Sequence, residues 1–287
     1  MAQPFMPQME PTGVGGLLDR TFKLYSSNFA KMLAAVAVVY VPYIVVASLM
    51  NEVAPSSVRD GTSSLVPLIL NVLALLILAF VFLPAATGAV TYLVSEQYLG
   101  RSISLGDAYR RAFRRLGSIL GASMLAGLIV VVGLLLLIVP GIIFILSFQV
   151  IVPAVIIEQL GATASLRRSW RLSKGERGVI LGAVLVIWVL SNVIQFAGST
   201  IGGLIFSQTP LLANIVGQLF MVLVQPLSTI VAVMIYYNLR VKKEGFDLEM
   251  LSQNVAGQST TEAIGVPPIA AAPAAPRPPQ SPQDPLI

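Results

Sequence analysis

Two glutamates stand where a membrane protein could perform acid–base or metal chemistry. Glu96 and Glu158 each follow a long apolar run, and each is followed by a glutamine. Paired carboxylates can act as general acid and base, but such sites normally add His or Asp at the same depth. The chain has no His and no Cys, which also excludes thiolate catalysis and disulfides. We therefore expect that the protein is not an enzyme and that it has no catalytic residue, no cofactor and no metal site. We interpret both glutamates as groups at the membrane interface beside arginine.

Uncharged polar side chains within the apolar runs are a second set of candidates. Asn192 and Gln195 are three residues apart and Gln218 and Gln225 are seven apart, so each pair shares one helix face. Interhelical hydrogen bonding is the simplest explanation, and a path for a neutral or lipidic solute is the alternative. Ion-coupled carriers usually place ionisable groups inside the membrane, and these runs have none. The set comprises Asn71, Gln149, Ser191, Asn192, Gln195, Gln218 and Gln225.

Basic residues on short amphipathic segments are the third set. From 104 to 116, apolar residues recur every three or four positions while four arginines and Asp107 cover the other face, which predicts an interfacial helix capped by Ser104. An arginine near anionic headgroups contributes about 1 kcal/mol. The alternative is that these charges only enforce topology. The candidate anionic-lipid contacts are Lys23, Arg110, Arg111, Arg114, Arg115, Arg167, Arg168 and Arg171.

The amphipathic segments recur as an internal repeat. Leu18, Leu105 and Leu166 each begin a copy, in which an aromatic–basic pair follows four residues later and a Leu-small-Ala triplet follows further on. The unit is an interfacial helix that leads into a membrane span, in a threefold pseudo-repeat. Two copies begin the span with a Gly-xxx-Gly pattern, which predicts close helix packing. These packing candidates are Gly117, Gly121, Gly178 and Gly182, and homodimerisation through them is the alternative use.

The composition and the gaps between charges predict the architecture. Charged residues make up 11% of the chain, hydrophobic residues make up 56%, and the mean hydropathy is +0.84. A soluble domain has about 25% charged residues, so an integral membrane protein is indicated and a soluble, collagen-like, coiled-coil or disordered chain is excluded. Val139-Pro140-Gly141 and the stretch from Gly198 to Pro210 are predicted connections. The predicted all-α fold has six transmembrane helices at about 32–50, 65–94, 117–138, 142–158, 178–197 and 211–237.

The distribution of Lys and Arg predicts the orientation. In the six-span arrangement nearly all of them fall on one side, and Arg59 is the exception within a connection. Because cytoplasmic loops carry an excess of Lys and Arg, both termini are predicted to be cytoplasmic. Residues 1–13 are expected to be a flexible N-terminus, 14–251 the membrane domain, and 252–287 a disordered Pro- and Ala-rich cytosolic tail.

Several of these stretches resemble a bacterial family of uncharacterised multi-pass proteins. The family includes the membrane domain found beside some glycerophosphodiester phosphodiesterases. The resemblance rests on residues 16–25, the 104–115 helix, the 138–141 hairpin, residues 166–172 and the run from Tyr236 to Asp247. It implies a six-helix membrane domain of undefined role. It does not bring phosphodiesterase activity, which belongs to a separate soluble domain with no counterpart here.

The sequence therefore predicts a multi-pass protein of the bacterial cytoplasmic (inner) membrane that is not an enzyme. Its expected role is that of a structural, assembly or lipid-interacting module, and the alternative is a transporter or channel for a neutral or lipidic solute. Expected partners are membrane lipids, among them anionic headgroups, and a protein partner or a second copy of the chain. No nucleic acid is expected as a partner.

Overall fold

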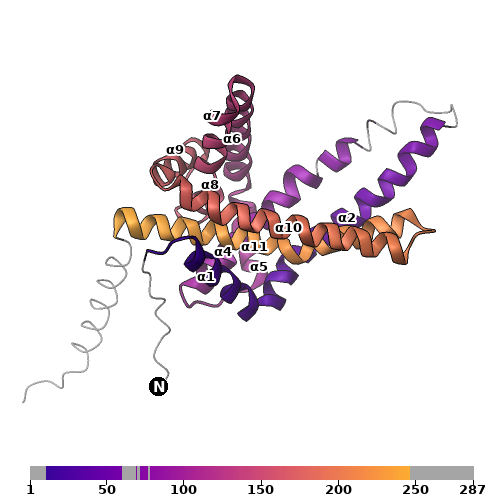
Figure 1. Cartoon of the computed structure of the whole chain (residues 1–287), viewed down its shortest axis with the longest axis horizontal. Helices are drawn as coiled ribbons and strands as arrows, with labels where there is room; N and C mark the ends of the chain where they lie inside the picture. The colour runs from indigo at the N-terminus through magenta and orange to yellow at the C-terminus, as the bar shows by residue number, and fades with distance from the viewer. Residues whose placement is uncertain (1–10, 60–68, 70–71, 77, 246–287) are drawn as a thin grey trace, which may run out of the picture. The chain divides into compact units, whose positions relative to one another are not determined.

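The computed structural model describes residues 11–59, 69, 72–76 and 78–245. Within these ranges the regular secondary structure is entirely helical (Figure 1). The elements are α1 (Val14–Ser27), α2 (Phe29–Arg59), η1 (Leu78–Phe82), α4 (Leu83–Tyr98), α5 (Leu105–Arg114), α6 (Leu116–Leu136), α7 (Ile138–Ser147), α8 (Ile151–Ile157), α9 (Ala162–Ser173), α10 (Arg177–Ile205) and α11 (Pro210–Glu244).

Six helical segments are long and apolar enough to cross a membrane, which is the pattern of a multi-pass membrane protein. A helix can cross because it satisfies its backbone hydrogen bonds internally, and about 20 residues suffice. Short helices precede three of the long ones, namely α1 before α2, α5 before α6 and α9 before α10. The six segments are Phe29–Leu49, Val72–Tyr98, Leu116–Leu136, Ile138–Ile157, Arg177–Ile205 and Pro210–Glu244.

Helix α11 is the centre of the bundle. It runs antiparallel beside α10 (Figure 1) and also contacts α1, α2, α4, α8 and α9. Every residue from Thr229 to Leu239 is buried. A helix that is buried on all sides needs apolar residues around its whole circumference, and the sequence of α11 supplies them over most of this stretch.

Helix α10 is longer than predicted. The sequence placed its end at residue 197 and a connection from Gly198 to Pro210, but the helix continues to Ile205. A Cβ at Gly198 would lie 2.6 Å from Phe220, and one at Gly202 would lie 2.5 Å from the carbonyl oxygen of Ala213. The glycines therefore let α10 and α11 approach closely, as small residues do in membrane helix pairs, and do not end the helix.

The turn between α6 and α7 also lies earlier than predicted. Leu137 has an extended backbone and separates the two helices, whereas Val139-Pro140-Gly141 belongs to the first turn of α7. Proline is tolerated there because the first helical N–H groups have no partner within the helix. A Cβ at Gly141 would lie 2.3 Å from Leu134, so this glycine serves the contact with α6.

The predicted fourth span, 142–158, corresponds to the segment Ile138–Ile157, but this segment is divided into two helices. Helix α7 ends at Ser147 and α8 begins at Ile151. Pro153 has no N–H for the Gln149 carbonyl, which a continuous helix would require. The carbonyl oxygen of Ser147 accepts hydrogen bonds from Ser169 and Ser173 of α9, at 2.7 and 3.2 Å. The break is thus stabilised by α9, which the sequence pattern did not indicate.

Three predicted features lie wholly or mostly outside the described residues: the start of the second span at 65, the tail at 252–287 and the flexible N-terminus.

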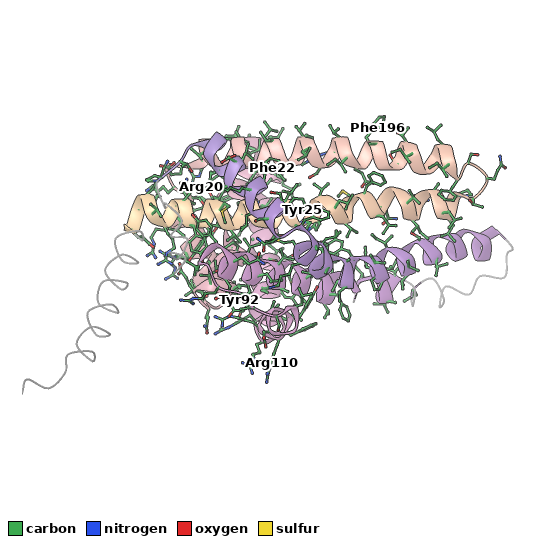
Figure 2. All side chains as sticks on the ribbon, turned by 90° about the horizontal axis from the view of Figure 1, so that it is seen from below. Arg20, Phe22, Tyr25, Tyr92, Arg110 and Phe196 are labelled. Atoms are coloured by element: carbon green, nitrogen blue, oxygen red, sulfur yellow. The ribbon has the colours of Figure 1, made fainter. Side chains whose placement is uncertain are left out.

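Figure 2 shows the side chains of the described residues. Phe196 points away from the bundle on α10 and is 73% exposed, and Arg110 projects from α5. Exposed apolar side chains along α6 and α10 suit a lipid environment, because hydrocarbon chains solvate them as well as a protein core does.

We predict opposite effects from two neighbouring substitutions in α10. Gly202→Ala should destabilise the protein by about 1–3 kcal/mol, because the new methyl group collides with the α11 backbone. Gly203→Ala should be neutral or stabilising by up to about 1 kcal/mol, because nothing lies within 4 Å of its Cβ position and alanine favours a helix. Thermal unfolding in detergent, followed by circular dichroism, measures both. Equal effects at the two positions would contradict the close approach of α10 and α11.

Candidate functional site

Helix α5 forms where the sequence predicts it, with the expected cap. The Ser104 hydroxyl accepts a hydrogen bond from the Asp107 N–H at 3.1 Å and donates one to the Asp107 carboxylate at 2.6 Å. Ala108 and Ala112 are fully buried against the bundle, and a Cβ at Gly88 of α4 would lie 3.2 Å from the Ala112 methyl group. Small residues on both helices therefore let α5 lie close to α4.

Tyr109 ties α5 to a second helix. Its hydroxyl donates a hydrogen bond to the backbone carbonyl oxygen of Ala35 in α2. Burial raises the pKa of Tyr109 to about 12, so the phenol stays protonated and remains a donor at physiological pH. Helix α5 is thus held by α4 and α2, and its charged face is fixed relative to the bundle.

Three arginines of α5 surround one cavity of about 380 Å³. Arg111 is placed by Tyr92 of α4, whose ring centre lies 4.4 Å from its guanidinium carbon. Arg110 and Arg114 are exposed, and Figure 2 shows Arg110 pointing outward on the same side of the bundle as Tyr92. The lining residues are Tyr92, Ile103, Asp107, Arg110, Arg111 and Arg114. Their three guanidinium groups exceed the one carboxylate, so the cavity favours an anion.

The other predicted lipid contacts differ in whether their charged groups are exposed or bound to other side chains. Lys23, Arg167 and Arg171 are exposed. Arg115 donates a hydrogen bond to the Gln159 side chain at 2.8 Å. Arg168 is occupied by protein carboxylates, as described below, so its guanidinium is not presented to a headgroup.

The predicted Gly-xxx-Gly pairs each place one glycine against a neighbouring helix. A Cβ at Gly121 would lie 3.1 Å from Ala162 of α9, and one at Gly182 would lie 2.8 Å from Val14 of α1. Gly117 and Gly178 have no atom of the described structure within 4 Å of a Cβ. The glycines that bring α10 and α11 together, Gly198 and Gly202, were not among the candidates, although they have the same four-residue spacing.

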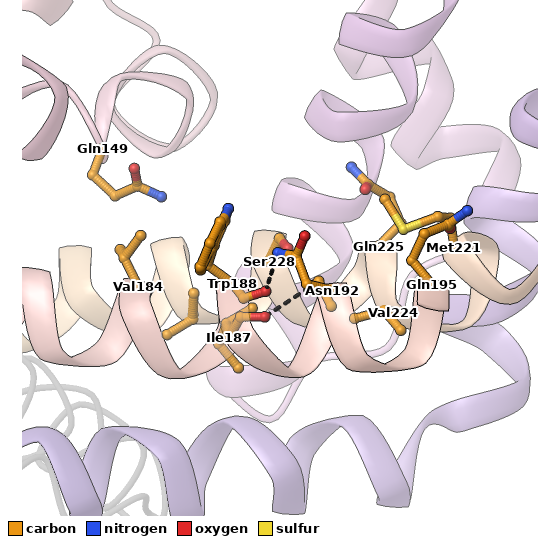
Figure 3. Close-up of a pocket in the computed structure, with 12 residues that line it drawn as sticks. Gln149, Val184, Ile187, Trp188, Asn192, Gln195, Met221, Val224, Gln225 and Ser228 are labelled. Atoms are coloured by element: carbon orange, nitrogen blue, oxygen red, sulfur yellow. Dashed lines mark hydrogen bonds between the residues drawn. The ribbon is translucent and has the colours of Figure 1, made fainter. Parts of the chain in front are cut away.

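Five of the seven polar candidates converge on one cavity of about 360 Å³ between α7, α8, α10 and α11 (Figure 3). We call it the polar groove. Gln149 comes from the break between α7 and α8, and the others come from α10 and α11. Its polar residues are Gln149, Ser191, Asn192, Gln195, Gln225 and Ser228. Gln218 lies elsewhere, with its amide 3.4 Å from the Ser48 hydroxyl of α2, and Asn71 lies outside the described residues.

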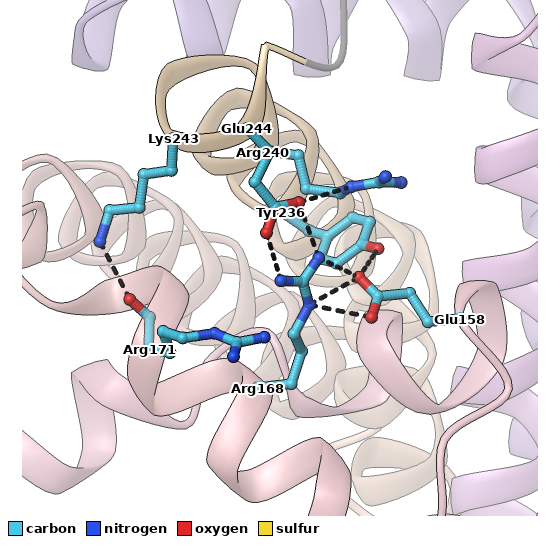
Figure 4. A network of polar contacts seen from close by, with 7 residues as sticks. All are labelled: Glu158, Arg168, Arg171, Tyr236, Arg240, Lys243 and Glu244. Carbon is cyan, nitrogen blue, oxygen red and sulfur yellow. Dashed lines mark hydrogen bonds and ion pairs between the residues drawn. The ribbon is translucent and has the colours of Figure 1, made fainter. Parts of the chain in front are cut away.

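Arg168 is the centre of an ion-pair network at one end of the bundle (Figure 4). Its Nε lies 2.8 and 2.9 Å from the two carboxylate oxygens of Glu158, and its other nitrogens bind Glu244. The Tyr236 hydroxyl donates to Glu158 at 2.6 Å, and Arg240 donates to Glu244 at 3.3 Å. The hydrogen bonds to Glu244, and to a smaller extent those to Glu158, raise the pKa of Arg168 above its usual range. Its positive charge therefore persists at every relevant pH.

Both glutamates that follow apolar runs therefore pair with arginine, as predicted. Glu96 lies 3.7 Å from Arg101, and Glu158 binds Arg168. Among the described residues, no group of three or more acidic, His or Cys side chains could hold a metal ion. The arrangement neutralises charge at helix ends and offers no pair of free carboxylates at these positions.

Sequence reasoning missed three consecutive residues of α11 that connect different parts of the bundle. Tyr236 reaches Glu158, the Tyr237 hydroxyl lies 2.7 Å from the Ser95 hydroxyl of α4, and the Asn238 side chain binds the backbone of Thr12 at 2.8 and 3.2 Å. Their polarity in an otherwise apolar run was the available signal. Successive helical residues point about 100° apart, so the three reach three different partners.

The family described as "Domain of unknown function (DUF7847)" matches residues 115–239. The match covers less than half of the chain, runs through most of α6–α11 and includes the whole polar groove. It leaves out α5 and Glu244. No curated protein and no solved structure matches the chain.

The network predicts a large effect at Arg168 and a small one at its neighbour. Arg168→Gln should destabilise the protein by about 2–3 kcal/mol, because it leaves the partly buried Glu158 carboxylate without a cationic partner and Glu244 with Arg240 alone. The partial exposure of both carboxylates places the effect below that of a fully buried pair. The matched control Arg167→Gln removes the same charge from an exposed site and should change stability by less than about 0.5 kcal/mol. Thermal unfolding in detergent measures the difference.

A double variant separates charge pairing from packing. Adding Glu158→Gln to Arg168→Gln removes one unpaired carboxylate, so the double variant should recover part of the lost stability. Losses that simply add would contradict the coupling of Arg168 to Glu158.

Proposed function

We propose that the protein is a lipid-interacting membrane module that binds anionic headgroups through α5. The observation that supports it is the gathering of Arg110, Arg111 and Arg114 around one cavity beside Tyr92. Guanidinium groups bind phosphate oxygens in pairs of parallel hydrogen bonds. The cavity suits a lipid phosphate group because several arginines face a single site.

The rigid support of α5 favours this proposal over charges that only set topology. The cap at Ser104, the buried alanines and the hydrogen bond from Tyr109 to α2 fix the direction of the arginine face. Topology requires positive charge only near the helix ends. A shaped site requires that the arginines be positioned, and here α2 and α4 position them.

We further propose both termini on the cytoplasmic side of a bacterial inner membrane. Contacts gather the basic connections at one end of the molecule: Lys242 lies 2.9 Å from Glu176, and Lys243 donates to the Arg171 carbonyl oxygen at 3.0 Å. Thr12 joins this end through Asn238. A shared end supports a shared side of the membrane, and the positive charge favours the cytoplasm.

We also propose that the chain contains a threefold repeat. We further propose that it is related to the membrane domains found beside some glycerophosphodiester phosphodiesterases. The order of a short helix before a long one at α1–α2, α5–α6 and α9–α10 supports the repeat. The three short helices differ in their surroundings, since α9 buries Ser165, Ser169 and Ser173 whereas α5 buries two alanines. A headgroup-binding role is therefore assigned to α5 alone.

The lipid proposal predicts that removing two exposed arginines of α5 weakens the binding of anionic lipid. Arg110→Gln with Arg114→Gln should lower the retention of phosphatidylglycerol about tenfold or more, since each arginine contributes about 1 kcal/mol. The full chain is delipidated, offered phosphatidylglycerol and phosphatidylcholine with the same acyl chains, and its bound lipid is counted by native mass spectrometry.

The matched control is Arg167→Gln with Arg171→Gln, which removes the same charge from exposed sites on α9. It should lose much less phosphatidylglycerol. Equal losses in the two double variants would show a general attraction to positive charge and would remove the site on α5.

The orientation predicts which engineered cysteines a membrane-impermeant maleimide reaches. Because the chain has no Cys, Ser102→Cys and Gln208→Cys each create a single reactive position, and both positions are exposed. In intact bacterial cells whose outer membrane has been made permeable, Gln208→Cys should react. Ser102→Cys should react only after the inner membrane is opened. The reverse pattern would overturn the orientation.

A further inference from the structure

We propose that the polar groove binds the headgroup region of an uncharged glycerolipid of the diacylglycerol class, which enters sideways from the bilayer. This site is separate from the arginine cavity on α5 and does not depend on the function proposed for it. The groove's position along α10 and α11, its unpaired acceptor, its lack of charge and its lateral opening support this occupant.

The groove lies near the middle of two spans. Ser191 is the central residue of α10, and Gln225 lies close to the centre of α11. At about 1.5 Å per residue, Asn192 is about 22 Å along the helix from Arg177 at the charged end of the bundle. With Arg177 at one edge of a hydrocarbon core about 30 Å thick, Asn192 lies inside the core, about 8 Å from the opposite edge. Polar groups at this depth favour a bound polar partner.

The hydrogen-bonding capacity of the groove is only partly used, and the Gln225 side chain already hydrogen-bonds Tyr40 of α2. The Ser191 hydroxyl and one N–H of the Asn192 amide donate to carbonyl oxygens of α10, both at 2.7 Å (Figure 3). The carboxamide oxygen of Gln195 is buried and accepts no hydrogen bond from any described residue. A buried acceptor without a donor costs about 1–3 kcal/mol, so a ligand hydroxyl would recover this energy by donating to Gln195 once the side chain turns its oxygen into the groove.

The groove selects against charge. Among the described residues that line it, none is ionisable. A phosphate or ammonium group here would be an unpaired charge inside the hydrocarbon core, which is costly. Carboxamides and hydroxyls instead offer both donors and acceptors. They match the free hydroxyl and the two ester carbonyl groups of a diacylglycerol.

The size and opening of the groove fit a lipid whose chains stay outside. A volume of about 360 Å³ lies at the lower end of the range for small-molecule pockets, so it holds a glycerol backbone but not two acyl chains. Trp188 lines the groove and is 60% exposed, which places the opening on the lateral surface. The acyl chains would then extend past Trp188 into the bilayer.

The break between α7 and α8 gives the groove its third polar wall. Discontinuous helices near the bilayer midplane build the binding sites of many membrane proteins. Here the break places Gln149 opposite α10 (Figure 3), and Ser169 and Ser173 satisfy the carbonyl group that it frees. The discontinuity is therefore stable without a ligand, and Gln149 remains available to bind one.

The test uses the full chain in liposomes with a diacylglycerol that carries a photoreactive diazirine near the glycerol end of one acyl chain. After illumination, mass spectrometry should locate the label on peptides of α7–α8, α10 and α11 that line the groove. Unlabelled diacylglycerol should compete for this labelling, whereas phosphatidic acid with the same chains should not. Equal competition by phosphatidic acid, or labelling mainly on the outer face around Phe196, would overturn the proposal.

Three variants sharpen the test. Gln195→Leu removes the acceptor that has no protein donor and should reduce the competable labelling about tenfold, which corresponds to about 1.4 kcal/mol. Ser228→Phe fills the groove, keeps the carboxamides and should also abolish labelling. The matched control Gln218→Leu changes the same side-chain type on α11 outside the groove and should retain it. Labelling of the first two at the level of the control would refute the site.

Circular dichroism and gel filtration check the fold of each variant, and competition on the unmodified protein tests the proposal without any substitution. The α5 variant Arg110→Gln with Arg114→Gln should label at the unmodified level, so failure of either proposal can be distinguished from failure of the other.

Discussion

A buried guanidinium must be neutralised where it lies, and this constraint fixes one end of the molecule. The Arg168 side chain is only 10% exposed and lies between the carboxylates of Glu158 and Glu244. These two residues follow α8 and end α11, so the ends of these two helices have to meet the middle of α9. Without both carboxylates the desolvation of the guanidinium would be uncompensated. The position of α11, on which most other helices pack, follows from this arrangement.

The same end of α11 carries the polar contacts that place the remaining helices. One helical turn directs Tyr236 to the end of α8, Tyr237 to α4 and Asn238 to the segment before α1. All three side chains are buried, so each needs a partner. Apolar packing between membrane helices has little directional preference, whereas these hydrogen bonds require a particular rotation of α11. They make this end of the bundle specific.

The sequence predicted the features that local pattern determines. Apolar length indicated six spans, and the periodicity from Leu105 to Leu116 together with Ser104 predicted α5 and its cap. Features that depend on a tertiary partner could not be predicted in this way. Gly198 and Gly202 appear to end a helix until α11 is seen beside them, and the break before Pro153 is stabilised by serines of α9. Arg168 resembles the exposed Arg167 in sequence, and only the fold distinguishes them. The polar candidates were identified, but their convergence on one groove depended on where α7 ends.

The contrast between the two regions of α11 is the basis for assigning function. At the charged end, Tyr236, Tyr237 and Asn238 all find protein partners, which suits a role in stability. Near the middle, Gln225 hydrogen-bonds Tyr40, but the groove that it lines also contains Gln195, whose buried oxygen has no donor among the described residues. Apolar residues could fill such a space and stabilise the bundle by packing, which is one of the forces that hold membrane helices together. Polar residues at that depth weaken the apolar packing unless something binds them. The stability of the bundle does not require the polar residues of the groove, so they are the ones to which a binding function is assigned.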